Sequence, residues 1–265
     1  MLFILNAMEE HDPIVVGGQA VNIWGRFYRN RSDVLARLHP LTSEDMDFHA
    51  NPSAMKELGR RIGNAVTTVP EMGDASPSAG VVAGELNGRR VRVDFLSGVL
   101  GVEDSAIRKD RMTIRGQLGD ETATITLLHP LDCLRSRLAN VNVLGRVSEH
   151  AVNQTVAAVE IVSAYVDHTL DRNDVREAQT TLKDLGYTIL RAHLGRRTHV
   201  ELGRRVDPAP VLERFADDER LDPRWRTHQL ASTITKVGNE AQRRLAKRRT
   251  PDAPRPTEIA PSKSN

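Results

Sequence analysis

Apolar and polar positions alternate in short runs through the first half of the chain and follow helical spacing through the second half. The apolar run PIVV (13–16) predicts a short strand, which ends in two glycines, Gly17 and Gly18. Val21 and Trp24 follow at helical spacing, so we expect a helix directly after the glycines. Taken alone, the glycine pair is also compatible with a plain turn between a strand and a helix.

An acidic segment, LTSEDMDFH (41–49), comes next. Interpreted as a strand, it places Ser43, Asp45, Asp47 and His49 on one face, because residues two apart point to the same side, roughly 6.5–7 Å from each other. Two apolar residues then face the other way. This pattern indicates paired carboxylates at a metal site, and an ordinary exposed acidic pair remains the alternative. For the histidine we expect a structural hydrogen bond and no ligand role.

The clearest local pattern is a hairpin with its turn at Asn87-Gly88, between GVVAGEL and RRVRVDFLSG. In the second strand Val93 and Phe95 face the core, so Asp94 must face the opposite side. Its carboxylate is either structural or part of the same site as the acidic segment. A second hairpin is predicted from RMTIRGQ and ETATITLL.

From Pro130 onward the spacing becomes helical, and proline suits the first position of a helix. A long helix is predicted over about 148–170 and another over about 173–185, followed by shorter ones that include 223–249. The segment after Pro251 is polar and proline-rich, which is typical of disorder. We therefore predict an α/β domain, a helical domain and a disordered tail, over residues 1–128, 129–250 and 251–265.

Composition narrows the class of protein. Of 265 residues 39% are hydrophobic, and no stretch approaches the roughly 18 apolar residues of a membrane span. The single cysteine, Cys133, excludes an intrachain disulfide and a cysteine-rich zinc site, so we expect a reduced, cytoplasmic setting without a membrane. The last 30 residues hold 8 Lys and Arg against 3 Asp and Glu. Such a tail either contacts nucleic acid or is simply solvated.

Three features line up in an order that suits nucleotide chemistry: a glycine pair opening a helix, an Asp-x-Asp strand, and a lone aspartate on a later strand. Glycines let backbone N–H groups approach phosphate, and a helix N-terminus favours negative charge. Three carboxylates on neighbouring strands can hold two Mg²⁺ ions about 3.5–4 Å apart. The sequence contains no G-x-S-x-G, H-E-x-x-H, Walker A or G-x-G-x-x-G motif, which excludes the usual hydrolase, P-loop and dinucleotide sites.

The combination VVGGQAVNIW…TSEDMDF…RVDFL resembles the nucleotidyltransferase superfamily with the DNA polymerase β-like fold. Within it, the chain is most similar to the AbiEii-type toxins. The resemblance implies an α/β domain with a mixed sheet followed by an α-helical domain. It also implies a Mg²⁺-dependent enzyme that transfers a nucleoside monophosphate from an NTP to an acceptor hydroxyl. The implied acceptor is an RNA 3′ end, such as that of tRNA, and the implied partner is a cognate antitoxin.

The resemblance also implies roles for the acidic residues. Asp45 and Asp47 would coordinate both Mg²⁺ ions. Asp94 would hold the catalytic ion and help to deprotonate the acceptor. Because 26 residues separate Gly18 from Asp45, the segment RNRSDVLARLHPLT is expected to be an insertion between the helix and the acidic strand.

The nucleotide-binding residues follow in the same way. Gly17 and Gly18 would seat the triphosphate, and Ser43 would bond to a phosphate oxygen. Toxins of this group carry a lysine early in the helical domain, where this chain has HPLDCLRSRLANV. Either Arg135 or Arg137 would supply the positive charge, although both are also typical of surface or ion-pair arginines. Alternative functions are nucleotidylation of a small molecule and a catalytically silent protein that binds a nucleotide or a partner.

Overall fold

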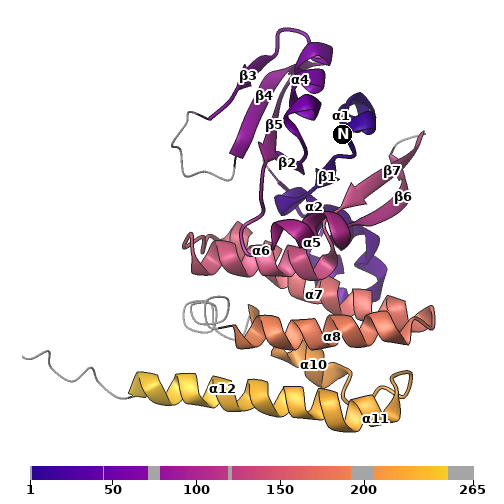
Figure 1. Ribbon diagram of the computed structural model, residues 1–265, viewed down its shortest axis with the longest axis vertical. Helices are drawn as coiled ribbons and strands as arrows, with labels where there is room; N and C mark the ends of the chain where they lie inside the picture. The colour runs from indigo at the N-terminus through magenta and orange to yellow at the C-terminus, as the bar shows by residue number, and fades with distance from the viewer. Residues whose placement is uncertain (1, 44, 71–77, 119–120, 192–205, 250–265) are drawn as a thin grey trace, which may run out of the picture.

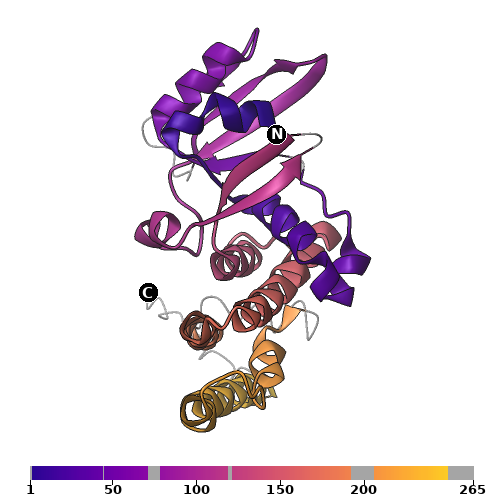
Figure 2. The same ribbon diagram turned by 90° about the vertical axis from the view of Figure 1, so that its right-hand side faces the viewer.

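A mixed β-sheet forms one end of the molecule and layers of helices form the rest (Figures 1 and 2). The computed structural model describes the chain apart from residues 1, 44, 71–77, 119–120, 192–205 and 250–265. The strands lie in the order β3-β4-β5-β2-β1-β7-β6. Their bounds are β1 (Ile14–Val15), β2 (Met46–His49), β3 (Val66–Thr68), β4 (Ser78–Leu86), β5 (Arg89–Leu96), β6 (Met112–Leu118) and β7 (Glu121–Leu127). The predicted α/β class with a mixed sheet is confirmed.

The centre of the sheet joins four strands that are far apart in the sequence. Strand β1 pairs antiparallel with β2 and parallel with β7, while β2 pairs parallel with β5. Phe48 of β2 and Phe95 of β5 are fully buried, with their ring centroids 6.5 Å apart. The apolar face of each strand therefore fixes which side its polar residues present to the outside.

Both predicted hairpins are present. Asn87 and Gly88 have φ values of 51° and 74°, and two positive φ angles in succession are the hallmark of the type I′ turn. The turn joins β4 to β5 in a register that is continuous from Leu86 back to Gly80 and shifts between Gly80 and Ser78. Strands β6 and β7 form the second hairpin, and the tip of its turn lies outside the described residues.

The acidic strand is shorter than predicted. It begins at Met46, so Ser43 and Asp45 precede it, and the Ser43 hydroxyl donates to the Asp45 carbonyl at 2.9 Å. The physical reason is the shortness of β1, whose chain turns into a helix at Gly17 and leaves nothing on that side to pair with Asp45. Residues 71–77, between β3 and β4, lie outside the described residues, and β4 begins at Ser78.

Helices cover the sheet and then stack away from it. In the first half they are α1 (Leu2–Ala7), α2 (Gly17–Phe27), α3 (Asp33–Leu38), α4 (Pro52–Arg61) and α5 (Asp104–Lys109), with single 3₁₀ turns at Glu9–His11 and Arg29–Arg31. In the second half they are α6 (Pro130–Asn142), α7 (Glu149–Asp171), α8 (Val175–Leu190), α10 (Ala209–Arg214), α11 (Pro223–Trp225) and α12 (Ala231–Arg249), with a π-helical turn at Arg226–Leu230. None of the described helices is long and apolar enough to cross a membrane.

The predicted boundary at residue 128 marks a change in the type of element. Every described element from Pro130 onward is helical, and Figure 1 shows α6, α7, α8 and α12 as successive layers below the sheet. One continuous cluster of buried residues nevertheless runs from the sheet into these helices. The proposed tail, 251–265, lies outside the described residues.

The predicted insertion between α2 and the acidic strand is an ordered brace. Ser32 caps α3 by accepting a hydrogen bond from the backbone N–H of Leu35, and its hydroxyl donates to Glu160 of α7 at 2.9 Å. Arg31 forms ion pairs with two further carboxylates of α7, at 2.7 and 2.9 Å. The segment therefore ties the N-terminal half of the chain to the longest described helix.

Candidate active site

Asp47 and Asp94 stand side by side at the centre of the sheet. They are direct partners in the register of the parallel strands β2 and β5, so their side chains point to the same face. Neighbouring strands lie about 4.8 Å apart, which brings the two carboxyl groups within reach of a shared cation. The hairpin at Asn87-Gly88 sets the register of β5 against β4, with Asp94 opposite Val81.

The pair is electrostatically unfavourable when nothing neutralises it. Burial raises the pKa of the Asp47 carboxyl from its ordinary 3.8 to about 6, and the negative charge of Asp94 raises it further in the same direction. Arg137 and Arg146 oppose this rise, because their positive charges stabilise the ionised form. A cation at this position would therefore be bound more tightly than at an isolated carboxylate.

The glycine turn lies directly against Asp47. Gly17 has a φ of +62°, and a Cβ atom at this position would overlap the carboxylate oxygen Oδ2 of Asp47. The backbone N–H of Val16 also donates to the Asp47 carbonyl at 3.0 Å. The first backbone N–H groups of α2, which have no acceptor within the helix, therefore open beside the carboxylate.

The second glycine fits into a narrow gap between two polar side chains. A Cβ atom at Gly18 would lie 2.9 Å from the amide of Gln154 and from the hydroxyl of Ser43. Gln154 belongs to α7 and is only 2% exposed. Its amide nitrogen donates to the Thr42 carbonyl at 2.9 Å, and its amide oxygen accepts from Arg137 at 3.0 Å. One buried glutamine therefore joins the glycine turn, the approach to the acidic strand and the helical half.

A cleft of about 580 Å³ opens beside these groups. Its sheet side carries Asp45 and Asp47, while the opposite wall carries Arg137, Arg146 and His150 from α6, the α6–α7 connection and α7. The remaining lining residues are Gly18, Ser43, Asn140, Val141, Gly145, Val147, Ser148, Ala151, Gln154 and Thr155. The cleft thus sets carboxylates that suit a cation opposite a positively charged wall that suits an anion.

Arg137 is the most informative residue of the positive wall. Burial lowers the pKa of its guanidinium, yet it forms no ion pair with any residue that the structure describes. Its Nε atom is buried and has no hydrogen-bond partner within the same part of the chain. A buried guanidinium without a counter-ion is costly, and phosphate oxygens of a ligand would satisfy it.

Arg135, the other predicted candidate, is not brought to this cleft. Its guanidinium donates to Asp132 at 2.8 Å and to Thr188 of α8 at 3.0 Å, so it fastens α6 to α8. The physical reason is helical geometry, since residues two apart on a helix point in nearly opposite directions. His49 is likewise structural, because its ring Nδ1 is hydrogen-bonded to the Leu96 carbonyl at 3.1 Å, as predicted.

The acidic residues supply some, but not all, of the ligands that a Mg²⁺ ion needs. No group of three His, Cys, Asp or Glu side chains within the described residues already converges to hold a metal ion. Asp45 is half exposed at the mouth of the cleft, 3.9 Å from Arg92, which also bonds to Asp94 at 3.2 Å. Mg²⁺ is normally bound by one or two carboxylates together with water and substrate phosphates, so the pair of Asp47 and Asp94 suits it.

Sequence reasoning missed three residues of this site. Arg92 could have been found, because it lies two positions before Asp94 and therefore shares its face of β5. Arg146 and Gln154 carried no local pattern that separates them from ordinary polar residues. Both reach the cleft only because α7 packs across the start of α2.

No family model, curated protein or solved structure matches the chain. The function is therefore argued from the geometry of the cleft.

Replacing Gly17 by alanine should destabilise the fold and displace the Asp47 carboxylate, because the position combines a positive φ with a steric overlap. We expect the free energy of unfolding to fall by more than about 2 kcal/mol in urea denaturation. Gly88→Ala is a matched control with positive φ but open space, and should cost only about 1–2 kcal/mol. Gly63→Ala has neither feature and should be nearly neutral. Equal losses in all three variants would contradict the contact.

The stability of the metal-free protein should depend on Asp47 in a defined pH range. Because the folded-state pKa of about 6 lies above the ordinary 3.8, the protonated carboxyl favours the folded state. This contribution is complete below pH 3.8 and is lost as the pH rises through 6. Relative to Asp47→Asn, the wild type should therefore lose on the order of 2–3 kcal/mol between pH 4 and 7.

This dependence can be measured by urea denaturation in EDTA, with the exposed Asp217→Asn as a control. Mg²⁺ at pH 7 should then stabilise the wild type and leave Asp47→Asn unchanged, because binding to the native state raises its stability. A parallel pH profile in wild type and Asp47→Asn would refute the raised pKa.

Proposed function

We propose that the protein is a metal-dependent nucleotidyltransferase with a polymerase β-like fold. It transfers a nucleoside monophosphate from an NTP to an acceptor hydroxyl and releases pyrophosphate. The observation that carries this proposal is the registered pair of Asp47 and Asp94, because Asp47 also lines a cleft with Gly18 and with Arg137, whose buried Nε has no hydrogen-bond partner among the described residues.

Three features of the cleft support an NTP as the substrate. Its volume of about 580 Å³ lies within the usual range of small-molecule sites. Gly17 and Gly18 open α2 beside the carboxylates, so backbone N–H groups face the position of a phosphate. Arg137 and Arg146 add two positive charges on the facing wall, which suit the β- and γ-phosphates.

The carboxylates provide the chemistry of the transfer. Asp47 and Asp94 would hold Mg²⁺, with Asp45 approaching from the mouth of the cleft; when bound, Mg²⁺ supplies positive charge for the attacking oxygen and the leaving group. The acceptor oxygen forms a bond to the α-phosphorus, and the bond from that phosphorus to pyrophosphate breaks. The proton of the acceptor hydroxyl passes to Asp94. Arg137 keeps the departing pyrophosphate oriented.

For the acceptor and the biological role we propose an RNA 3′ end, such as that of tRNA, and a toxin that is neutralised by a cognate antitoxin. The support is the motif order that resembles the AbiEii-type toxins. The open, positively charged wall of the cleft is compatible with a polyanionic acceptor.

Removing one carboxylate of the pair should abolish transfer without unfolding the protein. Asp47→Asn and Asp94→Asn keep the side-chain volume and remove one metal-binding charge, so we expect a loss of at least about 10³-fold. The assay incubates the protein with each α-labelled NTP, Mg²⁺ and total RNA, and measures label in the RNA. Asp217→Asn should retain full activity. Unchanged transfer in either site variant would refute the two-carboxylate assignment.

Substitutions of Arg137 and Arg135 should have different effects, the first on NTP binding and the second on the stability of the fold. Arg137→Gln should raise the KM for the NTP about tenfold or more, because it removes a charge from the phosphate wall. Arg135→Gln should leave that KM unchanged and lower the melting temperature, since it breaks the bonds to Asp132 and Thr188. The reverse pattern would show that the triphosphate lies on the other side of α6.

A further inference from the structure

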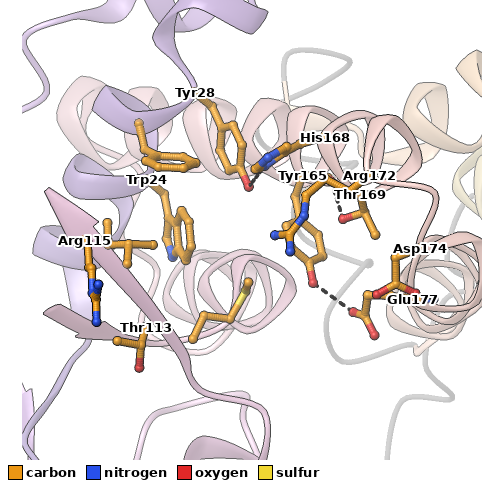
Figure 3. A pocket seen from close by; sticks show the side chains of 13 residues that line it. Trp24, Tyr28, Thr113, Arg115, Tyr165, His168, Thr169, Arg172, Asp174 and Glu177 are labelled. Atoms are coloured by element: carbon orange, nitrogen blue, oxygen red, sulfur yellow. Dashed lines mark hydrogen bonds between the residues drawn. The ribbon is translucent and has the colours of Figure 1, made fainter. Parts of the chain in front are cut away.

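A second pocket, of about 400 Å³, lies away from the carboxylates (Figure 3). It is lined by residues from the C-terminal part of α2, the end of α7, the start of α8 and strand β6, and shares no lining residue with the cleft. Along α7, Thr155 lines the cleft and Tyr165 lines the second pocket, which separates the two by about 15 Å of helix. Helices α2 and α7 therefore line the cleft near their N-terminal ends and the second pocket near their C-terminal ends.

One side of this pocket is a rigid aromatic wall. Trp24 and Tyr28 stack with their rings 11° from parallel, and Phe27 stands perpendicular to both. The Trp24 indole donates to the Leu128 carbonyl at 2.9 Å, and the Tyr28 hydroxyl is hydrogen-bonded to His168 at 3.2 Å. Phe27 is nevertheless 47% exposed, so its ring is available to a planar ligand.

The acidic groups of the pocket are already satisfied. Glu177 accepts hydrogen bonds from the hydroxyls of Tyr165 and Thr181, at 2.9 and 3.2 Å, and lies 3.6 Å from His129. The interaction with His129, followed by the hydrogen bonds from the two hydroxyls, lowers the pKa of Glu177 to about 2. Asp174 caps α8 by accepting from a backbone N–H. Both carboxylates therefore already accept hydrogen bonds from neighbouring groups of the protein.

The positively charged side chains of the pocket, by contrast, have no partner among the residues that the structure describes. Arg172 extends its guanidinium from the end of α7 into the space between the aromatic rings (Figure 3). Arg115 lines the pocket from β6. Among the residues that the structure describes, neither arginine has an ion-pair or hydrogen-bond partner for its guanidinium. The pocket therefore combines aromatic rings with positively charged groups that are suited to binding an anion.

We propose that this pocket binds one unpaired nucleotide, with its base against Phe27 and its phosphate on Arg172. Bases stack on aromatic side chains whatever their sequence, and guanidinium groups pair with phosphate oxygens. A free mononucleotide and a nucleotide within a single-stranded RNA share this chemistry. The proposal does not rest on the transfer reaction, because the pocket shares no lining residue with the carboxylate cleft.

The fluorescence of Trp24 reports on the pocket directly. The chain has two tryptophans, so Trp225→Phe leaves Trp24 as the single fluorophore. The protein is titrated in EDTA with each nucleoside monophosphate, with adenosine, with ribose 5-phosphate and with a short single-stranded RNA. We expect saturable changes with the nucleotides and about tenfold weaker binding of adenosine, which lacks the phosphate. Tighter binding of RNA than of mononucleotides would assign the site to a strand, and equal binding to a free nucleotide.

Variants in the same background locate the ligand. Arg172→Gln and Phe27→Leu should each weaken nucleotide binding about tenfold, because one removes the phosphate partner and the other the stacking ring. Arg26→Gln removes an exposed arginine beside Phe27 that does not line the pocket, and should bind normally, as should Asp47→Asn. Circular dichroism checks the fold of Phe27→Leu, and Arg172 is exposed, so its variant should fold.

Several results would overturn the proposal. These are the absence of saturable binding up to about 10 mM ligand, binding of ribose 5-phosphate as tight as that of a nucleotide, and unchanged binding in both Arg172→Gln and Phe27→Leu. Loss of binding in Arg137→Gln, with Arg172→Gln unaffected, would place the nucleotide in the carboxylate cleft instead. Nucleotide binding that persists in a protein without transfer activity would support this pocket and refute only the proposed reaction.

Discussion

The close approach of the Gly17 backbone to the Asp47 carboxylate is the contact on which the candidate site depends. It requires a residue without a side chain at a positive φ, directly after a strand that is two residues long. The contact brings the start of α2 beside the pair of Asp47 and Asp94. A wider separation would leave the carboxylates and the helix N-terminus as two unrelated features, because electrostatic stabilisation by a helix end falls off within one turn.

Helix α7 completes this arrangement from the other half of the chain. Gln154 holds the approach to the acidic strand and fixes Arg137 at the same time, so the phosphate wall and the carboxylates have a common support. The brace around Ser32 and Arg31 fastens α7 a second time. The arrangement of the cleft therefore depends on contacts that cross the predicted domain boundary, and the continuous core agrees with this view.

The two pockets lie near opposite ends of α2 and α7. At one end Asp47 is buried beside Asp94, which pairs with Arg92, whereas at the other end the carboxylate of Glu177 accepts hydrogen bonds from two hydroxyls. Among the residues that the structure describes, the buried Nε of Arg137 has no hydrogen-bond partner and the guanidinium of Arg172 forms no ion pair.

Local patterns in the sequence determined the hairpins, the helix after Gly17-Gly18 and the side of β5 that carries Asp94, because turn chemistry and alternation act between near neighbours. The local patterns overestimated the length of the acidic strand β2, because that length depends on how soon β1 ends. Only the tertiary structure chose Arg137 over Arg135, because the choice depends on which face of α6 meets α7. The same holds for Arg146, Gln154 and the aromatic pocket, whose members lie far apart in the chain and meet only through helix packing.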